Sequence, residues 1–99
     1  MRVMYKRCGG LDVHKKTVVA CRRRWRKAGW EIEVKTFGTM TVDLLALLDW
    51  LLAWEVEVVV LESTGEYWKP VFNLLEGNVE VWLVNAQHVK QVPGRKTDV

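Results

Sequence analysis

The apolar run Val-Val-Val-Leu at residues 58–61 constrains the fold of this chain more than any other feature. Its length and β-branched composition predict a strand covered on both faces, as in the parallel part of an α/β sheet. The run ends at Glu62, and Ser63, Thr64 and Gly65 follow at once. A carboxylate there is costly to bury unless it is paired, protonated or bound to a metal ion. Because α/β folds place their sites at the carboxyl ends of such strands, Glu62 is either a helix-capping residue or part of an active site.

The composition is that of one small domain. With 99 residues, of which 49% are hydrophobic and 27% charged, the chain can build a single core. No apolar stretch approaches the roughly 20 residues that cross a bilayer, and no apolar signal core follows the basic N-terminus. Cys8 and Cys21 are too few for a disulfide framework and lack metal-ligand spacing, so we expect reduced thiols, with Cys21 in the core. These features predict a cytoplasmic protein without a membrane partner.

The net charge of +3 is unevenly distributed along the chain. Residues 1–27 contain ten Lys and Arg and one acid, a charge of +9, whereas residues 28–99 contain five basic and eleven acidic residues, a charge of −6. Such concentrated positive charge suits a polyanion partner, because binding releases condensed counterions. A solvated basic surface is the ordinary alternative.

The first third of the chain predicts an antiparallel meander of three strands. Residues 11–13 form a short apolar element that starts nearer the N-terminus, and residues 17–21 have β-branched composition that continues through Arg26. Residues 27–29 form a turn, and residues 30–37 alternate at period two, which indicates a half-exposed strand.

The remainder alternates helices with strands. Gly38 ends the meander, Thr39 or Thr41 can cap a helix, and Asp43 suits its first turn. A second helix starts after a Ser63 or Thr64 cap and contains Pro70 in its first turn; it is followed by a strand at 79–84 and a short helix from Asn85 through Val89. Apolar residues at helical spacing define the two buried faces: Leu44, Leu45, Leu47, Leu48, Leu51 and Leu52 on the first, and Tyr67, Val71, Leu74 and Leu75 on the second.

The predicted order is therefore β-β-β-α-β-α-β-α. Three meandering strands followed by right-handed βαβ crossovers give an α/β fold with a mixed five-stranded sheet, and this is the order of the ribonuclease H-like fold. Asp12 would lie on the first strand and Glu62 at the end of the fourth. Those two strands are central neighbours in that fold.

Asp12 and Glu62 are candidate ligands of Mg²⁺, with Mn²⁺ as a substitute. Mg²⁺ prefers oxygen ligands and typically takes one or two carboxylates together with water and substrate phosphate. Two such ions about 4 Å apart can hold both reacting oxygens of a phosphodiester displacement. Asp98 is a possible third ligand from the C-terminal segment. The alternative for each acid alone is a capping or surface role.

Several cations and one aromatic residue are candidate contacts for nucleic acid. In the basic hairpin run, Trp25 can stack on a base, although a solvated hairpin is the equal alternative. His14 has the same orientation as Asp12 on an ideal strand, and Trp68 is either a stacking platform or a packing residue. The candidate phosphate contacts are His14, Lys15, Lys16, Arg22, Arg23, Arg24, Arg95 and Lys96.

Three stretches of the chain resemble a known family. The segments LDVHKKTVVAC, LESTGEYWKPVFNLLEG and VWLVNAQHVKQVPGRKTDV look like the N-terminal domain of insertion-sequence transposases with a DEDD acid set, the IS-one-ten family. The resemblance implies a RuvC-like nuclease domain of ribonuclease H-like fold that uses Mg²⁺ to cut and join DNA. Asp12, Glu62 and Asp98 match the first three acids of the set.

The sequence departs from the family pattern at its C-terminal end. The fourth acid would follow shortly after Asp98, but the sequence ends at Val99, before that acid and before the family's serine-bearing catalytic domain. The expectation is a truncated nuclease domain, residues 1–99, that folds and does not transpose alone. The resemblance also implies a structured guide RNA beside DNA, a homo-oligomer in the full-length protein, and a prokaryotic cytoplasm.

Two functions of other classes are alternatives. A non-catalytic nucleic-acid-binding module would keep the fold and the basic meander, and its binding would depend on salt but not on Mg²⁺. Half of an actin-like sugar kinase or ATPase would need a Gly-rich phosphate turn between its first two strands. The bulky, charged His14-Lys15-Lys16 stands in that place, which argues against a kinase.

Overall fold

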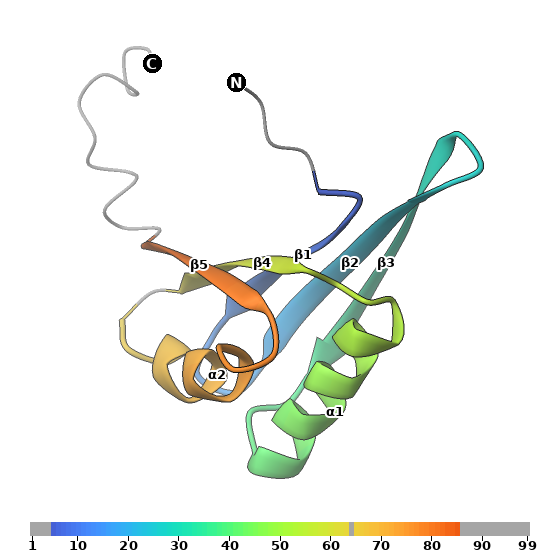
Figure 1. The fold of residues 1–99 in the computed structure, drawn as a ribbon. Helices are drawn as coiled ribbons and strands as arrows, with labels where there is room; N and C mark the ends of the chain where they lie inside the picture. Colours follow the sequence, from blue (N-terminus) through green and yellow to red (C-terminus); the bar gives the residue numbers. More distant parts are fainter. Residues whose placement is uncertain (1–4, 64, 86–99) are drawn as a thin grey trace, which may run out of the picture.

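The computed structural model describes residues 5–63 and 65–85, and Figure 1 shows their arrangement. The observed order β-β-β-α-β-α-β confirms the predicted order as far as the described residues reach. The helix predicted from Asn85 through Val89 lies beyond them, apart from Asn85 itself, which ends the last strand. The elements are β1 (Arg7–Val13), β2 (Val18–Arg26), β3 (Gly29–Phe37), α1 (Thr41–Ala53), β4 (Val58–Ser63), α2 (Trp68–Leu75) and β5 (Glu80–Asn85).

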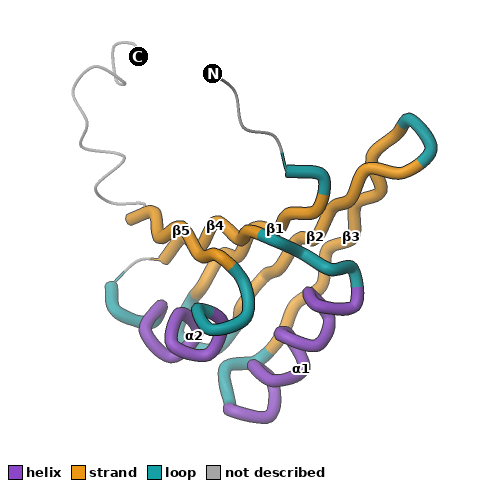
Figure 2. Tube along the Cα trace, viewed as in Figure 1, coloured by secondary structure: helices purple, strands orange, loops and turns teal. Residues whose placement is uncertain are grey.

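The strands form one mixed five-stranded sheet in the order β3-β2-β1-β4-β5. The β1–β2 and β2–β3 pairs are antiparallel, whereas β1–β4 and β4–β5 are parallel. Figures 1 and 2 show α1 and α2 on the same side of this sheet. The predicted α/β class with a mixed five-stranded sheet is confirmed. No helix in the described part of the chain is long and apolar enough to span a membrane.

The hydrophobic core lies between the two helices and one face of the sheet. Alternate residues of the central strands point into it, including Leu11 on β1 and Leu61 on β4, which are 3% and 0% exposed. Burying one such side chain contributes about 1.5–3 kcal/mol before conformational entropy is subtracted. The largest fully buried side chains are Leu47, Leu51, Leu61, Leu75, Val13, Val18, Val59 and Val71.

The opposite face of the sheet, which we call the open face, is covered by none of the described elements. Val60 on β4 is 39% exposed there, and Trp82 on β5 is 48% exposed. The prediction that residues 58–61 are covered on both faces is therefore wrong at Val60, whereas Val58, which points to the same face, is only 4% exposed. The hydrophobic run alone could not show that both crossover helices pack on one side.

Two further burial predictions need correction. Strand β3 is exposed on both faces from Trp30 to Thr36, not half-exposed, because it is an edge strand and α1 reaches only its end at Phe37. In α1, Leu45 and Leu52 are 46% and 39% exposed, so only part of the predicted leucine stripe packs on the sheet.

The helix ends also differ from the predicted caps. Met40, not Thr39 or Thr41, is the N-cap of α1, and its N–H donates to Asp43 Oδ2 at 3.1 Å, which confirms Asp43 in the first turn. Helix α2 starts later than a Ser63 cap requires, with Tyr67 as its N-cap; Thr64, the other predicted cap, lies outside the described residues.

The C-terminus of α1 returns the chain to the sheet. Glu55 adopts a left-handed conformation (φ 56°). The N–H of Glu55 donates to Leu52 O at 2.8 Å and that of Val56 to Leu51 O at 3.2 Å. These two bonds and the burial of Val56 against Leu51 define a Schellman motif, which ends α1 and leads into β4.

Gly9 lets α1 approach the centre of the sheet closely. A Cβ atom at Gly9 would lie 2.9 Å from Cys21 O and 3.4 Å from Leu51 Cδ2. The neighbouring Gly10 points to the open face, where a Cβ atom would find its nearest neighbour, Val60 O, at 3.9 Å. The absence of a side chain is therefore required at Gly9 and not at Gly10.

We predict that Gly9→Ala lowers the free energy of unfolding by about 1–3 kcal/mol, because the methyl group overlaps a backbone carbonyl that cannot move freely. Gly10→Ala is the matched control and should change it by less than about 0.5 kcal/mol. Urea unfolding followed by circular dichroism measures both. Equal stability of the two variants would contradict the close approach of Gly9 to the Cys21 carbonyl of β2.

Candidate active site

Asp12 and Glu62 lie side by side on the open face. The parallel register of β1 and β4 places Asp12 opposite Glu62, between the pairs Leu11–Leu61 and Val13–Ser63. Because Leu11 and Leu61 point into the core, the alternation of strand side chains directs both acids to the other face. Adjacent strands are about 4.8 Å apart, so the two carboxylates can reach one ion. The sheet thus brings together two predicted ligands that are 50 residues apart in sequence.

His14 and the loop after β1 lie at the same end of the sheet as the acid pair. His14 Nε2 lies 3.0 Å from Asp12 Oδ2, and both side chains are about half exposed. The His14 N–H donates to Thr17 O at 2.8 Å, which closes a tight turn around Lys15 and Lys16. Both lysines are exposed, so two cations stand close in sequence to the acid pair. His14 therefore fixes one oxygen of Asp12, as its predicted orientation requires.

A hollow of about 280 Å³ on the open face contains the acid pair. Its floor passes over Gly10, whose missing side chain leaves room beside Asp12. Two exposed carboxylates suffice for Mg²⁺ when water and substrate phosphate supply the other ligands. No group of three or more His, Cys, Asp or Glu side chains able to hold a metal occurs within residues 5–63 and 65–85. Asp98, the predicted third ligand, lies outside those ranges, as do Arg95 and Lys96.

Arg22 has a structural role in the described fold. Its Nη1 donates to Trp50 O at 2.5 Å, its Nε donates to Glu33 Oε1 at 3.1 Å, and its guanidinium lies 4.3 and 4.2 Å from the Trp50 and Trp54 rings. The residue is 9% exposed. Arg22 thus brings a positive charge and a donor to the C-terminal end of α1, whose last turn has no basic residue. We therefore remove it from the predicted phosphate contacts.

Strand alternation divides the rest of the arginine run. Arg24 points to the same side as Arg22, where it donates to Glu31 Oε1 at 2.7 Å and lies 4.0 Å from the Trp54 ring. Arg23 points to the open face and lies 4.0 Å from the Trp30 ring. Of the three arginines in this run, all predicted to contact nucleic acid, Arg23 alone shares a face with the acid pair.

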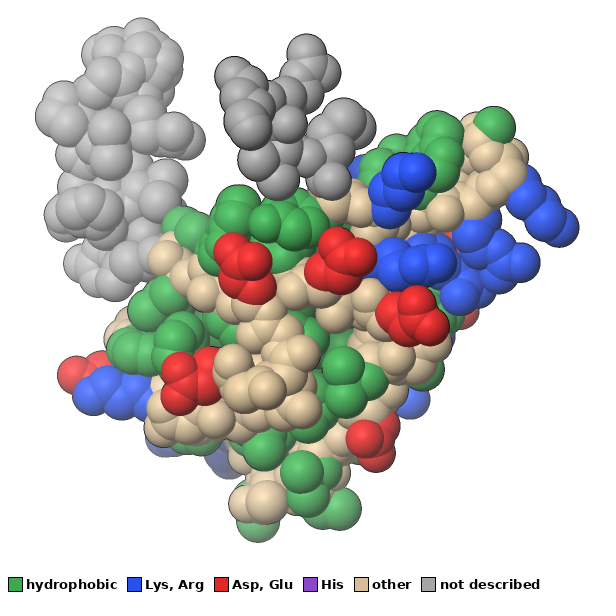
Figure 3. All heavy atoms as spheres, viewed as in Figure 1, with side chains coloured by type: hydrophobic (Ala, Val, Ile, Leu, Met, Phe, Trp, Pro, Cys, Tyr) green, Lys and Arg blue, Asp and Glu red, His purple; other side chains and the backbone are tan. Residues whose placement is uncertain are grey.

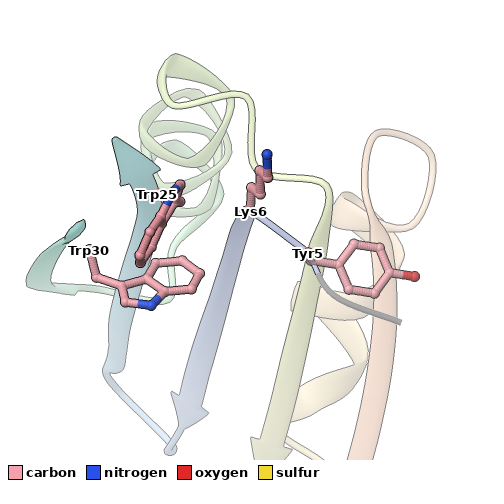
Figure 4. Close-up of a pocket in the computed structure, with 4 residues that line it drawn as sticks. All are labelled: Tyr5, Lys6, Trp25 and Trp30. Atoms are coloured by element: carbon pink, nitrogen blue, oxygen red, sulfur yellow. The ribbon is translucent and has the colours of Figure 1, made fainter. Parts of the chain in front are cut away.

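A second hollow, of about 290 Å³, lies beside the hairpin of β2 and β3. Figure 4 shows the Trp25 and Trp30 rings next to one another, with Lys6 nearby and the Tyr5 ring directed away. The two tryptophan rings meet edge to face with centroids 5.3 Å apart. Sequence reasoning singled out Trp25 and missed Trp30, although a two-residue turn at Lys27-Ala28 pairs these two positions.

Basic side chains gather at the hairpin, away from the acid pair. Figure 3 shows the Lys and Arg side chains clustered where β2 and β3 extend beyond the sheet. Asp12 pairs with Val19 at the other end of β2, seven residues from Arg26, or roughly 23 Å along the strand. The basic residues of the first third of the chain that the structure describes therefore lie mainly towards the two ends of β2, and of these Lys15 and Lys16 stand next to the acid-bearing end.

The structure exposes Tyr67 and packs Trp68. Tyr67 was expected in the core but is 46% exposed, whereas Trp68 packs against the core and meets Phe72 edge to face at 5.7 Å. Tyr67 precedes α2 as its N-cap and is not part of the helical face, on which Val71 and Leu75 are buried as predicted. The packing role considered for Trp68 therefore fits the structure better than a stacking platform.

The cysteines line the open face. Cys21, expected in the core, is only partly buried and borders the same hollow as the acids. Cys8 is partly buried nearby, and this burial raises the pKa of its thiol above the ordinary value. A protonated thiol is a poor nucleophile, so Cys8 is not suited to nucleophilic chemistry at neutral pH.

Comparison with protein families gives one match that spans the site. A family model described as a transposase, of the IS110 type with a DEDD acid set, matches residues 9–99. The matched region includes Asp12, Glu62 and Asp98. Comparison with curated proteins gives no match.

Solved structures show only distant similarity. The crystal structure of the Aquifex aeolicus member of the Ppx/GppA family has 11% sequence identity and a TM-score of 0.47. A second structure, of the Aquifex aeolicus PPX-GPPA enzyme, has 13% identity and a TM-score of 0.43. Each match covers 83% of this chain and 36% of the other, so the chain spans about a third of their length. Similarity at this level assigns no function.

The Arg24–Glu31 pair predicts a pH-dependent contribution to stability. The hydrogen bond from Arg24 is the largest cause that holds the pKa of Glu31 below its ordinary value of 4.5. A lowered folded-state pKa stabilises the fold above the ordinary value, and this contribution is lost as the pH falls through the folded-state pKa. We therefore expect Glu31→Gln to lower the melting temperature slightly at pH 7 and to have no effect at the acid end of a pH series. Glu76→Gln, at an exposed glutamate, is the control and should show no such trend.

The buried contacts of Arg22 give a second prediction. Arg22→Lys should lower the free energy of unfolding by roughly 1–3 kcal/mol, because an ammonium group cannot bond Glu33 and Trp50 O while it stacks between two indole rings. Arg26→Lys, at a half-exposed cation of the same strand, should change it by less than about 0.5 kcal/mol. Chemical denaturation checks both. If Arg22→Lys left the free energy of unfolding unchanged, Arg22 would again be a candidate phosphate contact.

Proposed function

The chain belongs to the IS110 family of transposases with a DEDD acid set, and on this premise we propose that it is a metal-dependent nuclease domain that helps to cut and join DNA. The observation that carries the proposal is the register that sets Asp12 beside Glu62 on the open face. The same register supports a ribonuclease H-like, RuvC-like fold, because the sheet order β3-β2-β1-β4-β5 places the two acid-bearing strands at its centre.

The residues present fit Mg²⁺, and Mn²⁺ as a substitute. Asp12 and Glu62 are both exposed, border one hollow and offer the oxygen ligands that these ions prefer. When bound, Mg²⁺ supplies charge neutralisation at the reacting phosphate oxygens. His14 holds Asp12 Oδ2 in place, and Asp98, which the matched region includes, is the proposed third acid.

DNA is the proposed substrate, and different cations are proposed to contact different parts of it. Lys15 and Lys16 stand close enough in sequence to the acids to hold the phosphates on either side of a scissile bond. Arg23 and the hollow at Trp25 would contact a more distant part of a nucleic acid, either DNA or the structured guide RNA that the family resemblance implies. Arg95 and Lys96 remain proposed phosphate contacts. Transposition itself, as a homo-oligomer, is proposed for the full-length protein.

Metal binding tests the proposal directly. With Mg²⁺ or Mn²⁺ at about ten times the dissociation constant, binding should stabilise the fold by roughly 1.4 kcal/mol and raise the melting temperature by roughly 7 °C. Asp12→Asn and Glu62→Gln should each abolish most of this rise. Asp49→Asn, at an exposed acid of α1, is the control and should keep it.

The same melting curves separate loss of the site from loss of the fold. Without metal, Glu62→Gln should melt no lower than the original chain, because the substitution removes repulsion between two neighbouring carboxylates. A full metal response in Asp12→Asn would refute the site. DNA binding that depends on salt in a chain without any metal response would favour the non-catalytic nucleic-acid-binding module instead.

A further inference from the structure

Strand β3 has a free edge along its whole length. It pairs with β2 on one side, and no other described strand pairs with it. Ile32 and Val34 are 58% and 64% exposed on the open face, beside this edge. Soluble proteins rarely leave a nine-residue strand with exposed β-branched residues unpaired, because its free N–H and C=O groups attract another strand.

The hairpin turn determines which backbone groups are free. Lys27 and Ala28 both have positive φ, 52° and 65°, and Arg26 pairs with Gly29, as in a two-residue type I′ hairpin. In such a hairpin the closing pair exchanges both hydrogen bonds, and bonded pairs then alternate. Glu31 and Glu33 therefore bond β2, whereas the N–H and C=O groups of the even-numbered residues 30–36 point away from the sheet.

The sequence of β3 places residues that can pair with one another at equal distances on either side of Glu33. In antiparallel pairing of two copies centred on Glu33, Ile32 faces Val34 of the other copy, and Glu31 faces Lys35 of the other copy. None of the ion pairs of the described residues involves Lys35. The two Glu33 side chains would meet at the axis, where each is already bonded to Arg22 of its own chain. This register also has the longest overlap, because Glu33 is the middle residue of β3.

We propose that two copies of this chain pair through β3 in this register. Residues 30, 32, 34 and 36 of both copies then form about eight backbone hydrogen bonds, since each facing pair exchanges two. The two-fold axis is perpendicular to the sheet, so the five-stranded sheets join with both open faces on the same side. This interface is independent of the proposed nuclease function, because it uses none of the acid-site residues.

The three charged residues of β3 admit the opposite interpretation. Charged side chains on an edge strand are a common protection against pairing, and Glu31, Glu33 and Lys35 all point to the helix-bearing side. Protection by charge works best when the charges repel in every register. Here the central register sets two Glu31–Lys35 attractions against one Glu33 pair that Arg22 neutralises. Each Glu31 also contacts Arg24 and Arg26 of its own chain. Lys35 of the other copy therefore adds to an existing cluster, and the complementarity favours association.

Cysteine cross-linking tests the register. In a background with Cys8→Ser and Cys21→Ser, the variants Ile32→Cys and Val34→Cys are prepared separately, mixed and oxidised. In the proposed register Ile32 and Val34 of opposite copies have Cα atoms about 5.5 Å apart, within disulfide range, whereas two copies of the same variant do not. The mixture should therefore give a covalent dimer on a non-reducing gel, and neither variant should do so alone.

Each other outcome overturns the proposed register or the interface. Dimers of Val34→Cys alone would indicate an axis at Val34, and dimers of Ile32→Cys alone an axis at Ile32. If neither the mixture nor the single variants cross-link efficiently, although circular dichroism shows that both variants are folded, then β3 does not pair.

Sedimentation of the unmodified chain over a range of concentrations provides the second measurement. Lys35→Glu replaces two attractive contacts per dimer by two repulsive ones and should weaken dimerisation about tenfold. Lys69→Glu makes the same charge change on α2, which packs beside β4 and β5 rather than β3, and should leave dimerisation unchanged. A monomer at all concentrations, or equal effects of the two variants, would overturn the proposal.

Discussion

The parallel pairing of β1 with β4 is the interaction on which the rest of the structure depends. It joins the N-terminal meander to the crossover half of the chain, and it sets Leu11 beside Leu61 in the core. The same register sets Asp12 beside Glu62 on the opposite face. A slip of β4 by one residue would bring Glu62 to the helix side and Leu61 to the open face, so the apolar contacts that stabilise the fold also fix the site. Gly9 allows this pairing to be covered closely by α1.

The alternation of side chains along β2 explains why a basic sequence does not give one basic surface. Arg22 and Arg24 point to the helix-bearing side, where Trp50, Trp54 and two glutamates engage their guanidinium groups. Arg23 points the other way. Part of the positive charge of residues 1–27 therefore forms contacts that hold β2, β3 and α1 together. In the described part of residues 1–27, exposed cations at the two ends of β2 remain candidates for contact with a polyanion.

The element order, the antiparallel meander and the central position of Asp12 and Glu62 were all predictable, because β-branched runs, turn residues and helical spacing are local signals. The orientation of Arg22 was not, since a run of four basic residues around Trp25 carries no apolar alternation that assigns a face. Pairing each residue across the Lys27-Ala28 turn would have given the relative faces, but not which face the helices cover. Tyr67 was placed in the core wrongly because the helical spacing was extended to a residue that precedes α2. One face of the sheet stays open because both crossover helices pass on the other side. No local stretch of sequence determines that side.

Because the acid pair is exposed, its effect on the stability of the fold can be considered separately from its proposed chemistry. A buried pair of carboxylates would cost several kcal/mol and would have to be offset by the rest of the fold. Asp12 and Glu62 instead lie at the solvent-facing end of the sheet, where water screens their repulsion and the fold does not require either charge. Two neighbouring carboxylates with a histidine at 3.0 Å and two lysines in the next turn fit the metal site that we propose, because a divalent cation would balance the acids and a substrate phosphate would balance the lysines.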